Sequence, residues 1–352
     1  MKIGEMTYRW LWSCLMVGGL LLTGCGDKEE VSLPEPEQGS PLELRSLTRT
    51  DGATPFVAGN EWNIRAYLTE ATKVVKEDGL FKYTGTGWTS NLSVKEERQY
   101  YLYGYMPSSI SGSFAAPVGG NYADGVDLTF ASLPDITATD LCVVVGVQRV
   151  DAAEAAANVT EGNYGYLSGI VGKNYVNLLM GHLYSSLQLS FKIDEDYAKL
   201  RTIRLKEVKL NSSYGNVSTT VQLRKGTGVG APTFTKLKNS AANPSVDFLS
   251  TSETPIDLGK DNTVNYLTLN KMVYCIPSIF DAEGTYVSIT STYDVLDKKG
   301  ISIGERTSTN KIKVTASSLT PGQKKNVIVT VRPTYLYVLS DNDLDNPVLE
   351  ID

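Results

Sequence analysis

Tyr101-Leu102-Tyr103-Gly104-Tyr105 is the clearest strand signal in this chain of 352 residues. Its alternation places Tyr101, Tyr103 and Tyr105 on one face of an extended strand. The chain has 20 tyrosines, and this residue type favours pleated surfaces. Further short β-like runs, separated by Gly, Asn, Asp, Ser and Pro, lie at 42–44, 141–147, 187–193, 203–210, 265–269, 286–293, 311–314 and 326–331. The sequence therefore predicts an all-β protein.

The division into domains follows from the spacing of these runs. Many short strands with turn signals between them are typical of β-sandwiches. A Gly/Asn-rich stretch ends just before Tyr175, where a new series of strands begins. We therefore expect two β-sandwich domains in tandem, residues 50–175 and 176–332, each of a common domain size. A short helix is expected at the alanine-rich residues 150–158.

The N-terminus has the pattern of a secretory signal. Lys2 and Arg9 make its start positive, and residues 10–22 form an apolar run. The run is shorter than the ~20 residues that cross a bilayer. Leu22-Thr23-Gly24-Cys25 looks like a bacterial lipobox, where cleavage precedes the cysteine and lipid is added to its sulfur. We expect residues 1–24 to be a signal peptide and lipid on Cys25 to attach the chain to a membrane.

Residues 26–40 are acidic and contain proline, which indicates a flexible tether. Acidic residues just after a lipidated cysteine also resemble the surface-export signal of lipoproteins in Gram-negative gut and oral anaerobes. A plain solvated linker is the alternative. The net charge of −6 and the absence of a basic stripe argue against a nucleic-acid partner.

A search for catalytic and metal-binding patterns finds little. His182 is the single histidine, it has apolar neighbours, and no Gly-x-Ser-x-Gly motif accompanies it. Usual zinc sites need Cys and His at short spacing, whereas Cys142 and Cys275 lie far apart. Both cysteines are in apolar runs, which favours buried free thiols over a disulfide. We expect no enzyme activity, cofactor or metal site, although paired carboxylates for glycoside hydrolysis stay open.

Two further motifs have ordinary structural interpretations. Residues 226–230 (GTGVG) lack the GK[ST] ending of a phosphate-binding loop, so we expect a hairpin or loop. Residues 341–346 (DNDLDN) place acids at calcium-loop spacing, but Asn346 stands where glycine is needed. A solvated turn between two strands is the favoured interpretation.

Four segments, taken in order, resemble the fimbrillins, also called type V pilins. They are Leu47-Thr48-Arg49-Thr50 followed by Pro55-Phe56 and Gly59, residues 100–107 (YYLYGYMP), residues 178–193 (LLMGHLYSSLQLSFKI) and residues 333–341 (PTYLYVLSD). The resemblance spans most of the chain beyond the signal. It implies transthyretin-like sandwich domains and cleavage by an arginine-specific protease after Arg49, with Arg45 as a second candidate. A strand containing Leu42, Leu44 and Leu47 would leave after the cut, so residues 25–49 would form a lipidated tether and removable strand.

The C-terminal tail is the second feature that the resemblance explains. Residues 335–339 and 348–351 are apolar, and a free apolar tail would be an exposed edge. It must pack on its own domain, as an ordinary last hairpin, or insert into a neighbouring subunit. The fimbrillin resemblance implies insertion, with residues 333–352 as a donor-strand tail. The candidate donor residues are Tyr335, Tyr337, Leu339, Val348, Leu349 and Ile351.

Together these features predict a structural subunit, stalk or anchor, of cell-surface fimbriae that supports adhesion. It would be an outer-membrane lipoprotein whose partners are other fimbrial subunits, by strand exchange, and an arginine-specific protease. The alternative is a surface lipoprotein that binds glycans, for which Trp62, Trp88 and the tyrosine run could supply stacking surfaces.

Overall fold

The fold was analysed in a computed structural model of the whole chain. The structure describes residues 39–49, 62–70, 73–150, 159–169, 174–212, 215–230, 233–236, 244–260, 266–277, 287–312, 319–332 and 343–351. For residues 73–77, 233–236, 332 and 343–351 it describes the backbone. Apart from one short helix, the helices and strands of the described residues are all β-strands, so the prediction of an all-β fold is confirmed.

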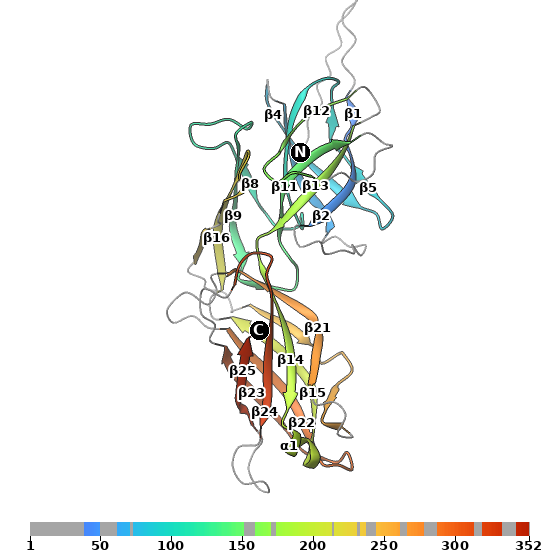
Figure 1. The fold of residues 1–352 in the computed structure, drawn as a ribbon, viewed down its shortest axis with the longest axis vertical. Coiled ribbons are helices and arrows are strands. Elements are labelled where there is room, and N and C mark those ends of the chain that lie inside the picture. Colours follow the sequence, from blue (N-terminus) through green and yellow to red (C-terminus); the bar gives the residue numbers. More distant parts are fainter. Residues whose placement is uncertain are drawn as a thin grey trace, which may run out of the picture. The chain divides into compact units, whose positions relative to one another are not determined.

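Two sheets contain most strands of the first half of the chain (Figure 1). Sheet I consists, in spatial order, of β2 (Glu43–Arg49), β13 (Tyr175–His182), β11 (Cys142–Val150), β7 (Gln99–Met106), β3 (Ile64–Glu70), β4 (Lys73–Tyr83) and β5 (Trp88–Ser90), with β12 (Gly165–Leu167) against β7. Sheet II consists of β17 (Gly228–Val229), β16 (Asn216–Arg224), β9 (Gly125–Pro134) and β8 (Ser113–Ala115), with β18 (Thr233–Lys236) against β16. A small pair, β1 (Ser40–Pro41) and β6 (Ser93–Val94), lies beside sheet I.

Two further sheets contain most strands of the second half. Sheet III consists of β10 (Ile136–Thr137), β21 (Tyr266–Cys275), β14 (Ser185–Ile193), β24 (Lys324–Arg332) and β25 (Asp343–Ile351). Sheet IV consists of β19 (Ser245–Leu249), β15 (Thr202–Ser212), β22 (Val287–Leu296) and β23 (Ser302–Ile312), with β20 (Ile256–Leu258) against β15. Pairing is antiparallel except for β2 with β13 and β14 with β24.

Most strands expected from sequence are present. The tyrosine run lies in β7, where Tyr103 and Tyr105 are buried and Tyr101 packs against the same core, as the alternation predicted. The segment 226–230 contains the end of the tight turn after β16 and the whole of β17, so the expected hairpin is present. Cys142 and Cys275 are both buried and free, which confirms the preference for unpaired thiols. The expected helix at 150–158 lies outside the described residues, apart from Val150 at the end of β11.

A single short helix, α1 (Glu195–Leu200), is present in the described part of the chain. Asp194 begins it, because its carboxylate accepts hydrogen bonds from the backbone N–H groups of Asp196 and Tyr197. Among the described residues, no helix has the length and apolar character that crossing a bilayer requires.

The buried side chains form two clusters. The larger one lies between sheets I and II and continues between sheets III and IV, with Phe130 and Phe191 among its largest members. The smaller one, called the β2 core here, lies under β2 on the other face of sheet I. It contains Leu42, Leu44 and Leu47 together with side chains from β7, β11 and β13.

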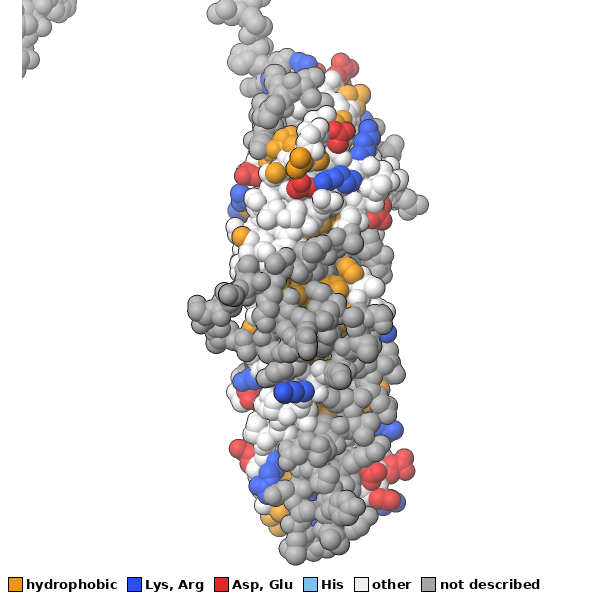
Figure 2. All heavy atoms as spheres, turned by 90° about the vertical axis from the view of Figure 1, so that its left-hand side faces the viewer, with side chains coloured by type: hydrophobic (Ala, Val, Ile, Leu, Met, Phe, Trp, Pro, Cys, Tyr) orange, Lys and Arg blue, Asp and Glu red, His pale blue; other side chains and the backbone are white. Residues whose placement is uncertain are grey.

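The chain passes between these sheets more than once. β13 ends at His182 in sheet I, and β14 starts at Ser185 in sheet III. β16 pairs with β9, so sheet II contains strands from both sides of the expected boundary near Tyr175. The separation into two independent domains at that point therefore stays a prediction. On the face shown in Figure 2, the described charged side chains of both signs are interspersed.

Candidate functional site

β2 is an edge strand of sheet I and pairs with one neighbour, β13, in parallel. The leucines of this segment point inward: Leu44 and Leu47 are 5% and 7% exposed, and Leu42, just before the strand, is fully buried. Leu44 and Leu47 are three residues apart, and both reach the inner face because the register against β13 shifts after Leu44. These three side chains cover the β2 core. A strand with these properties is expected at residues 42–47 from sequence. One ladder, this row of leucines and the contacts of Arg45 and Arg49 hold β2 against the rest of the sheet.

Arg49, the last residue of β2, points into a cluster of polar side chains. Its Nη2 donates to Asp140 Oδ2, and it lies 3.5 Å from His182 Nδ1 and 4.0 Å from Cys142 Sγ. The ion pair is buried, since the Arg49 and Asp140 side chains are 11% and 8% exposed. We call Arg49, Asp140, Cys142 and His182 the Arg49 cluster. Its charged pair is costly to break, because either partner alone would be a buried uncompensated charge.

Strand register brings the other three members together. Cys142 and His182 are directly opposite each other in the antiparallel β11–β13 ladder. Asp140 lies two residues before Cys142, in the link between β10 and β11. His182 Nδ1 lies 2.6 Å from Asp140 Oδ2, and Cys142 Sγ lies 3.3 Å from Oδ2 and 3.5 Å from Nδ1. The β2–β13 ladder pairs Arg49 with Met180, which places its guanidinium within reach of all three.

The electrostatics of the cluster keep the thiol neutral. Burial, with the negative charge of Asp140 as the next cause, raises the pKa of the Cys142 thiol well above its usual range. Burial also raises the pKa of the nearby Tyr274 hydroxyl, while Arg49 acts in the opposite direction. Cys142 therefore stays a protonated thiol at neutral pH as long as the cluster has this arrangement.

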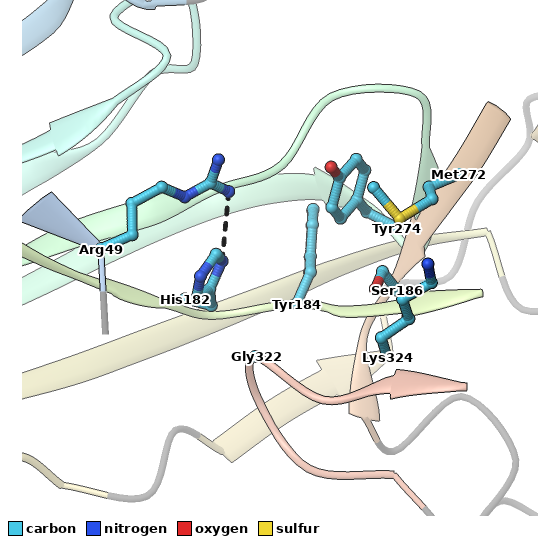
Figure 3. A pocket seen from close by; sticks show the side chains of 8 residues that line it. All are labelled: Arg49, His182, Tyr184, Ser186, Met272, Tyr274, Gly322 and Lys324. Atoms are coloured by element: carbon cyan, nitrogen blue, oxygen red, sulfur yellow. Dashed lines mark hydrogen bonds between the residues drawn. The ribbon is translucent and has the colours of Figure 1, made fainter. Parts of the chain in front are cut away.

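A small cavity opens beside the cluster (Figure 3). Its volume is about 260 Å³, below the ~300–1,000 Å³ of typical ligand pockets. The lining residues come from sheets I and III, the link between β13 and β14, and the turn before β24: Arg49, His182, Tyr184, Ser186, Met272, Tyr274, Gly322 and Lys324. Arg49 and His182 close one end of it, and Lys324 lies at the other (Figure 3).

The cluster does not have the geometry of a nucleophilic triad. In a triad the histidine contacts the nucleophile with one ring nitrogen and the acid with the other. Here Cys142 and Asp140 both lie against Nδ1 of His182. The thiol is also completely buried and has a raised pKa, so it is neither accessible nor activated.

The sequence-predicted site residues have different places in the structure. Cys25, Tyr335, Tyr337 and Leu339 lie outside the described residues. Arg45 lies in the middle of β2, where its exposed side chain places Cζ 4.1 Å from the centre of the Tyr175 ring. The candidate cleavage site at Arg49 is the buried end of the same strand.

The three remaining donor-strand candidates, Val348, Leu349 and Ile351, lie in β25. Within this single chain, β25 pairs antiparallel with β24, where Ile351 is opposite Val327 and Leu349 is opposite Val329. Of the segment considered as a calcium loop, residues 343–346 belong to this strand, so that part is extended backbone and not the expected turn.

The sequence does not show that Asp140, Cys142 and His182 lie together in one cluster. His182 is predicted to be packed or hydrogen-bonded, and it is buried against Asp140. The available signal was Asp140-Leu141-Cys142, in which alternation puts the carboxylate and thiol on one side of a strand.

Trp62 and Trp88, the proposed sugar-stacking residues, are partly buried and pack against the β2 core.

No model of a known protein family matches the chain, and no curated protein matches it in sequence. Solved structures with similar backbones come from Bacteroides. A candidate cell adhesion protein of Bacteroides uniformis has 12% identity and a TM-score of 0.39, with 89% of this chain and 97% of that one covered. A fimbrial protein of Bacteroides ovatus has 11% identity and a TM-score of 0.34, with 83% and 49% covered.

A third neighbour, from Bacteroides thetaiotaomicron, is described as a candidate polysaccharide-binding protein. It has 9% identity and a TM-score of 0.34, and the match covers 85% of this chain and 94% of that one. Because all three TM-scores lie below 0.5, these likenesses carry no argument about the function of this chain.

Proposed function

We propose that the chain is a structural subunit, stalk or anchor, of cell-surface fimbriae and supports adhesion without catalysis. It would be exported as an outer-membrane lipoprotein through Cys25, cut after Arg49 by an arginine-specific protease, and assembled with other subunits by strand donation. The observation that carries the proposal is β2: an edge strand at the N-terminal side of the described chain, which covers a buried core and ends at an arginine.

Loss of β2 would expose apolar side chains and backbone groups that strongly favour the binding of a replacement strand. Burial of a leucine side chain contributes roughly 2 kcal/mol, so Leu42, Leu44 and Leu47 together represent a large apolar area returned to water. The departure would also leave unpaired backbone groups along β13. A strand supplied by another subunit can satisfy both needs, with main-chain hydrogen bonds giving affinity and alternate side chains giving register.

β25 is the part of the chain that fits the role of donor. It is an edge strand of sheet III, so its removal interrupts no interior ladder. Its nine residues are enough to cover the seven of β2. Val348, Leu349 and Ile351 would supply apolar side chains. In the assembly β25 would exchange its place beside β24 for a place on a neighbouring subunit.

The environment of Arg49 makes cleavage conditional. A protease that recognises arginine must bind the guanidinium, which here is engaged with Asp140 in a buried position. Cleavage after Arg49 therefore requires the end of β2 to open first. Arg45 has an exposed side chain and lies at an irregularity of the ladder, but the residues on both sides of it, Leu44 and Ser46, are paired with β13. Both sites thus need at least part of β2 to leave β13.

The test treats the full-length chain with an arginine-specific protease and follows intact mass and SDS-resistant ladders. The matched variants Arg49→Lys and Arg45→Lys keep the charge but remove the recognised residue. We expect cleavage at residue 49 in the wild type and in Arg45→Lys, none there in Arg49→Lys, and no ladders from a chain ending at Arg332.

Other outcomes would contradict the proposal. Complete cleavage at residue 49 that yields monomers alone would exclude a polymerising stalk and indicate a tip or accessory subunit. Absence of both cleavage and ladders would instead support the glycan-binding alternative. A glycan binder should keep its ligand when the residues after Arg332 are removed.

A further inference from the structure

Asp140, Cys142 and His182 offer three different ligand atoms at one point of sheet I. The carboxylate oxygen, the sulfur and the ring nitrogen all lie within 4.8 Å of one another. Asp140 also has a second buried oxygen, Oδ1, with no hydrogen-bond partner among the described residues. The mechanism of strand donation uses none of these three side chains. Their combination of oxygen, sulfur and nitrogen is a set that zinc and related transition-metal ions bind.

The distances between the ligand atoms fit a tetrahedral ion. With zinc–ligand bonds of about 2.0–2.3 Å, the edges of the tetrahedron are about 3.3–3.6 Å. Cys142 Sγ lies 3.5 Å from His182 Nδ1 and 3.3 Å from Asp140 Oδ2. The third edge, from Nδ1 to Oδ2, is shorter at 2.6 Å because a hydrogen bond joins the two groups. An ion that replaces that proton would separate them.

In this chain the positive charge beside the three ligand atoms is the guanidinium of Arg49. Its Nη2 contacts the carboxylate and lies 3.5 Å from the imidazole and 4.0 Å from the thiol. A divalent ion at the same ligands would lie a few ångströms from the guanidinium and be strongly repelled by it. Arginine stays charged at any pH the fold tolerates, so β2 delivers a permanent cation to the cluster.

We propose that Asp140, Cys142 and His182 form a latent site for a zinc-class divalent ion, which Arg49 keeps closed while β2 is in place. Release of Arg49 uncovers the three ligands and leaves them without a compensating charge. A metal ion then binds to the carboxylate, to Nδ1 of the neutral imidazole and to the thiolate. The proton that joined Nδ1 to Asp140 is then carried on Nε2, the other tautomer of the ring, and the thiol proton is released to solvent. The adjacent cavity leaves room for water as a fourth ligand. The ligand set disfavours calcium and magnesium, which prefer oxygen alone.

The proposed metal site involves these residues alone and can be tested without proteolytic cleavage of the chain. Substitution of Arg49 removes the guanidinium without any cleavage, so a failure of the protease experiment leaves this test intact. The position of Arg45 on the same strand supplies a matched control, because its exposed guanidinium faces Tyr175 and not the cluster.

The test titrates Co²⁺, a spectroscopic substitute for Zn²⁺, into the full-length chain under reducing conditions. The readouts are the thiolate-to-cobalt charge-transfer band and the visible bands of a tetrahedral ion. We expect Arg49→Ala to bind Co²⁺ roughly 100-fold more tightly than the wild type or Arg45→Ala, since the repulsive charge is gone. Excess Zn²⁺ should abolish the bands, and Cys142→Ser in the Arg49→Ala background should remove the charge-transfer band.

A second variant protects the test against loss of folding. Arg49→Gln keeps most of the stem and a hydrogen-bond donor for Asp140 but has no charge, and Zn²⁺ should raise its melting temperature while leaving the wild type unchanged. Equal cobalt affinity in the wild type and in a folded, uncharged variant would overturn the proposal. So would a charge-transfer band that survives Cys142→Ser, because the signal would then come from another cysteine.

Discussion

Asp135 and Asp140 lie on either side of the short strand β10, and the fold compensates their buried carboxylates in different ways. Asp140 receives the guanidinium of Arg49. Asp135, which is completely buried, accepts hydrogen bonds from the Ser212 hydroxyl and, at 3.0 Å, from the backbone N–H of Gly215. Burial outweighs these neutral donors and raises the pKa of Asp135 to about 6.

The two aspartates differ in whether their bonding partners can leave during the proposed processing. The partner of Asp140 is on β2, a strand that leaves with Arg49 in the proposed processing. The partners of Asp135 lie at the end of β15 and just before β16, and its own backbone N–H and C=O bond to Gly215 and Ile276. Asp135 thus joins sheets II, III and IV permanently, whereas Asp140 is held by a removable charge.

The largest expected effect is that of removing the charge beside Asp140. Arg49→Ala should lower the free energy of unfolding by about 4 kcal/mol, because Asp140 is left as a buried carboxylate without its cation. Chemical denaturation at neutral pH, with the metal chelated, measures the change.

Arg45→Ala is the control for that experiment, since it removes an exposed arginine from the same strand. Its loss should be about 1 kcal/mol or less, the size of an exposed cation–π contact. Equal losses for the two variants would show that Arg49 acts only through general effects of β2, and the contrast drawn between the two aspartates would fail.

The second prediction concerns pH and Asp135. The folded-state pKa of about 6 lies above the ordinary value of 3.8, so the folded chain binds more protons between about pH 4 and 6. Stability from this group is therefore complete below pH 4 and is lost as the pH rises through 6. A shift of about two pKa units corresponds to about 3 kcal/mol.

Asp135→Asn removes this titration. The stability of the variant relative to the wild type should rise by about 3 kcal/mol between pH 4 and pH 7, as measured by denaturation at several pH values. Ser291→Ala, at a buried serine of β22 that has no charge to titrate, should show no such trend. A flat difference for Asp135→Asn would mean that the hydrogen bonds compensate its charge fully.

The sequence alone predicts some of these strands and not others. The strands were predictable where alternation is local, as in the tyrosine run of β7 and in β14, because inward and outward positions follow from the pleat alone. β16 was not predicted, although Val217, Val221 and Leu223 are buried on one face. Thr219, which lies between Val217 and Val221, interrupts the occurrence of an apolar residue at every second position.

The Arg49 cluster required information that the sequence does not contain locally. Arg49 and His182 are 133 residues apart, and they meet because β2 adds in parallel to β13. Strand order and register depend on how whole sheets pack, so only the pair Asp140 and Cys142 could have been noticed. Asp135 likewise carried no signal, since its partner Ser212 is one of many serines until β15 is placed.

The smallest expected effect tests that last contact. The Ser212 hydroxyl donates to Asp135 Oδ2 and lowers the pKa of the carboxyl, so it stabilises the ionised form. Ser212→Ala should therefore raise the pKa of Asp135 further and cost about 1.5 kcal/mol at pH 7, where the carboxylate is charged. The cost should shrink at pH 5, where Asp135 is mostly protonated and needs the donor less. Ser291→Ala, at a buried serine of β22, is the control, and its cost should not change with pH. If the cost of Ser212→Ala is also constant between pH 5 and 7, the hydroxyl serves packing alone, and burial with the Gly215 N–H determines the titration of Asp135.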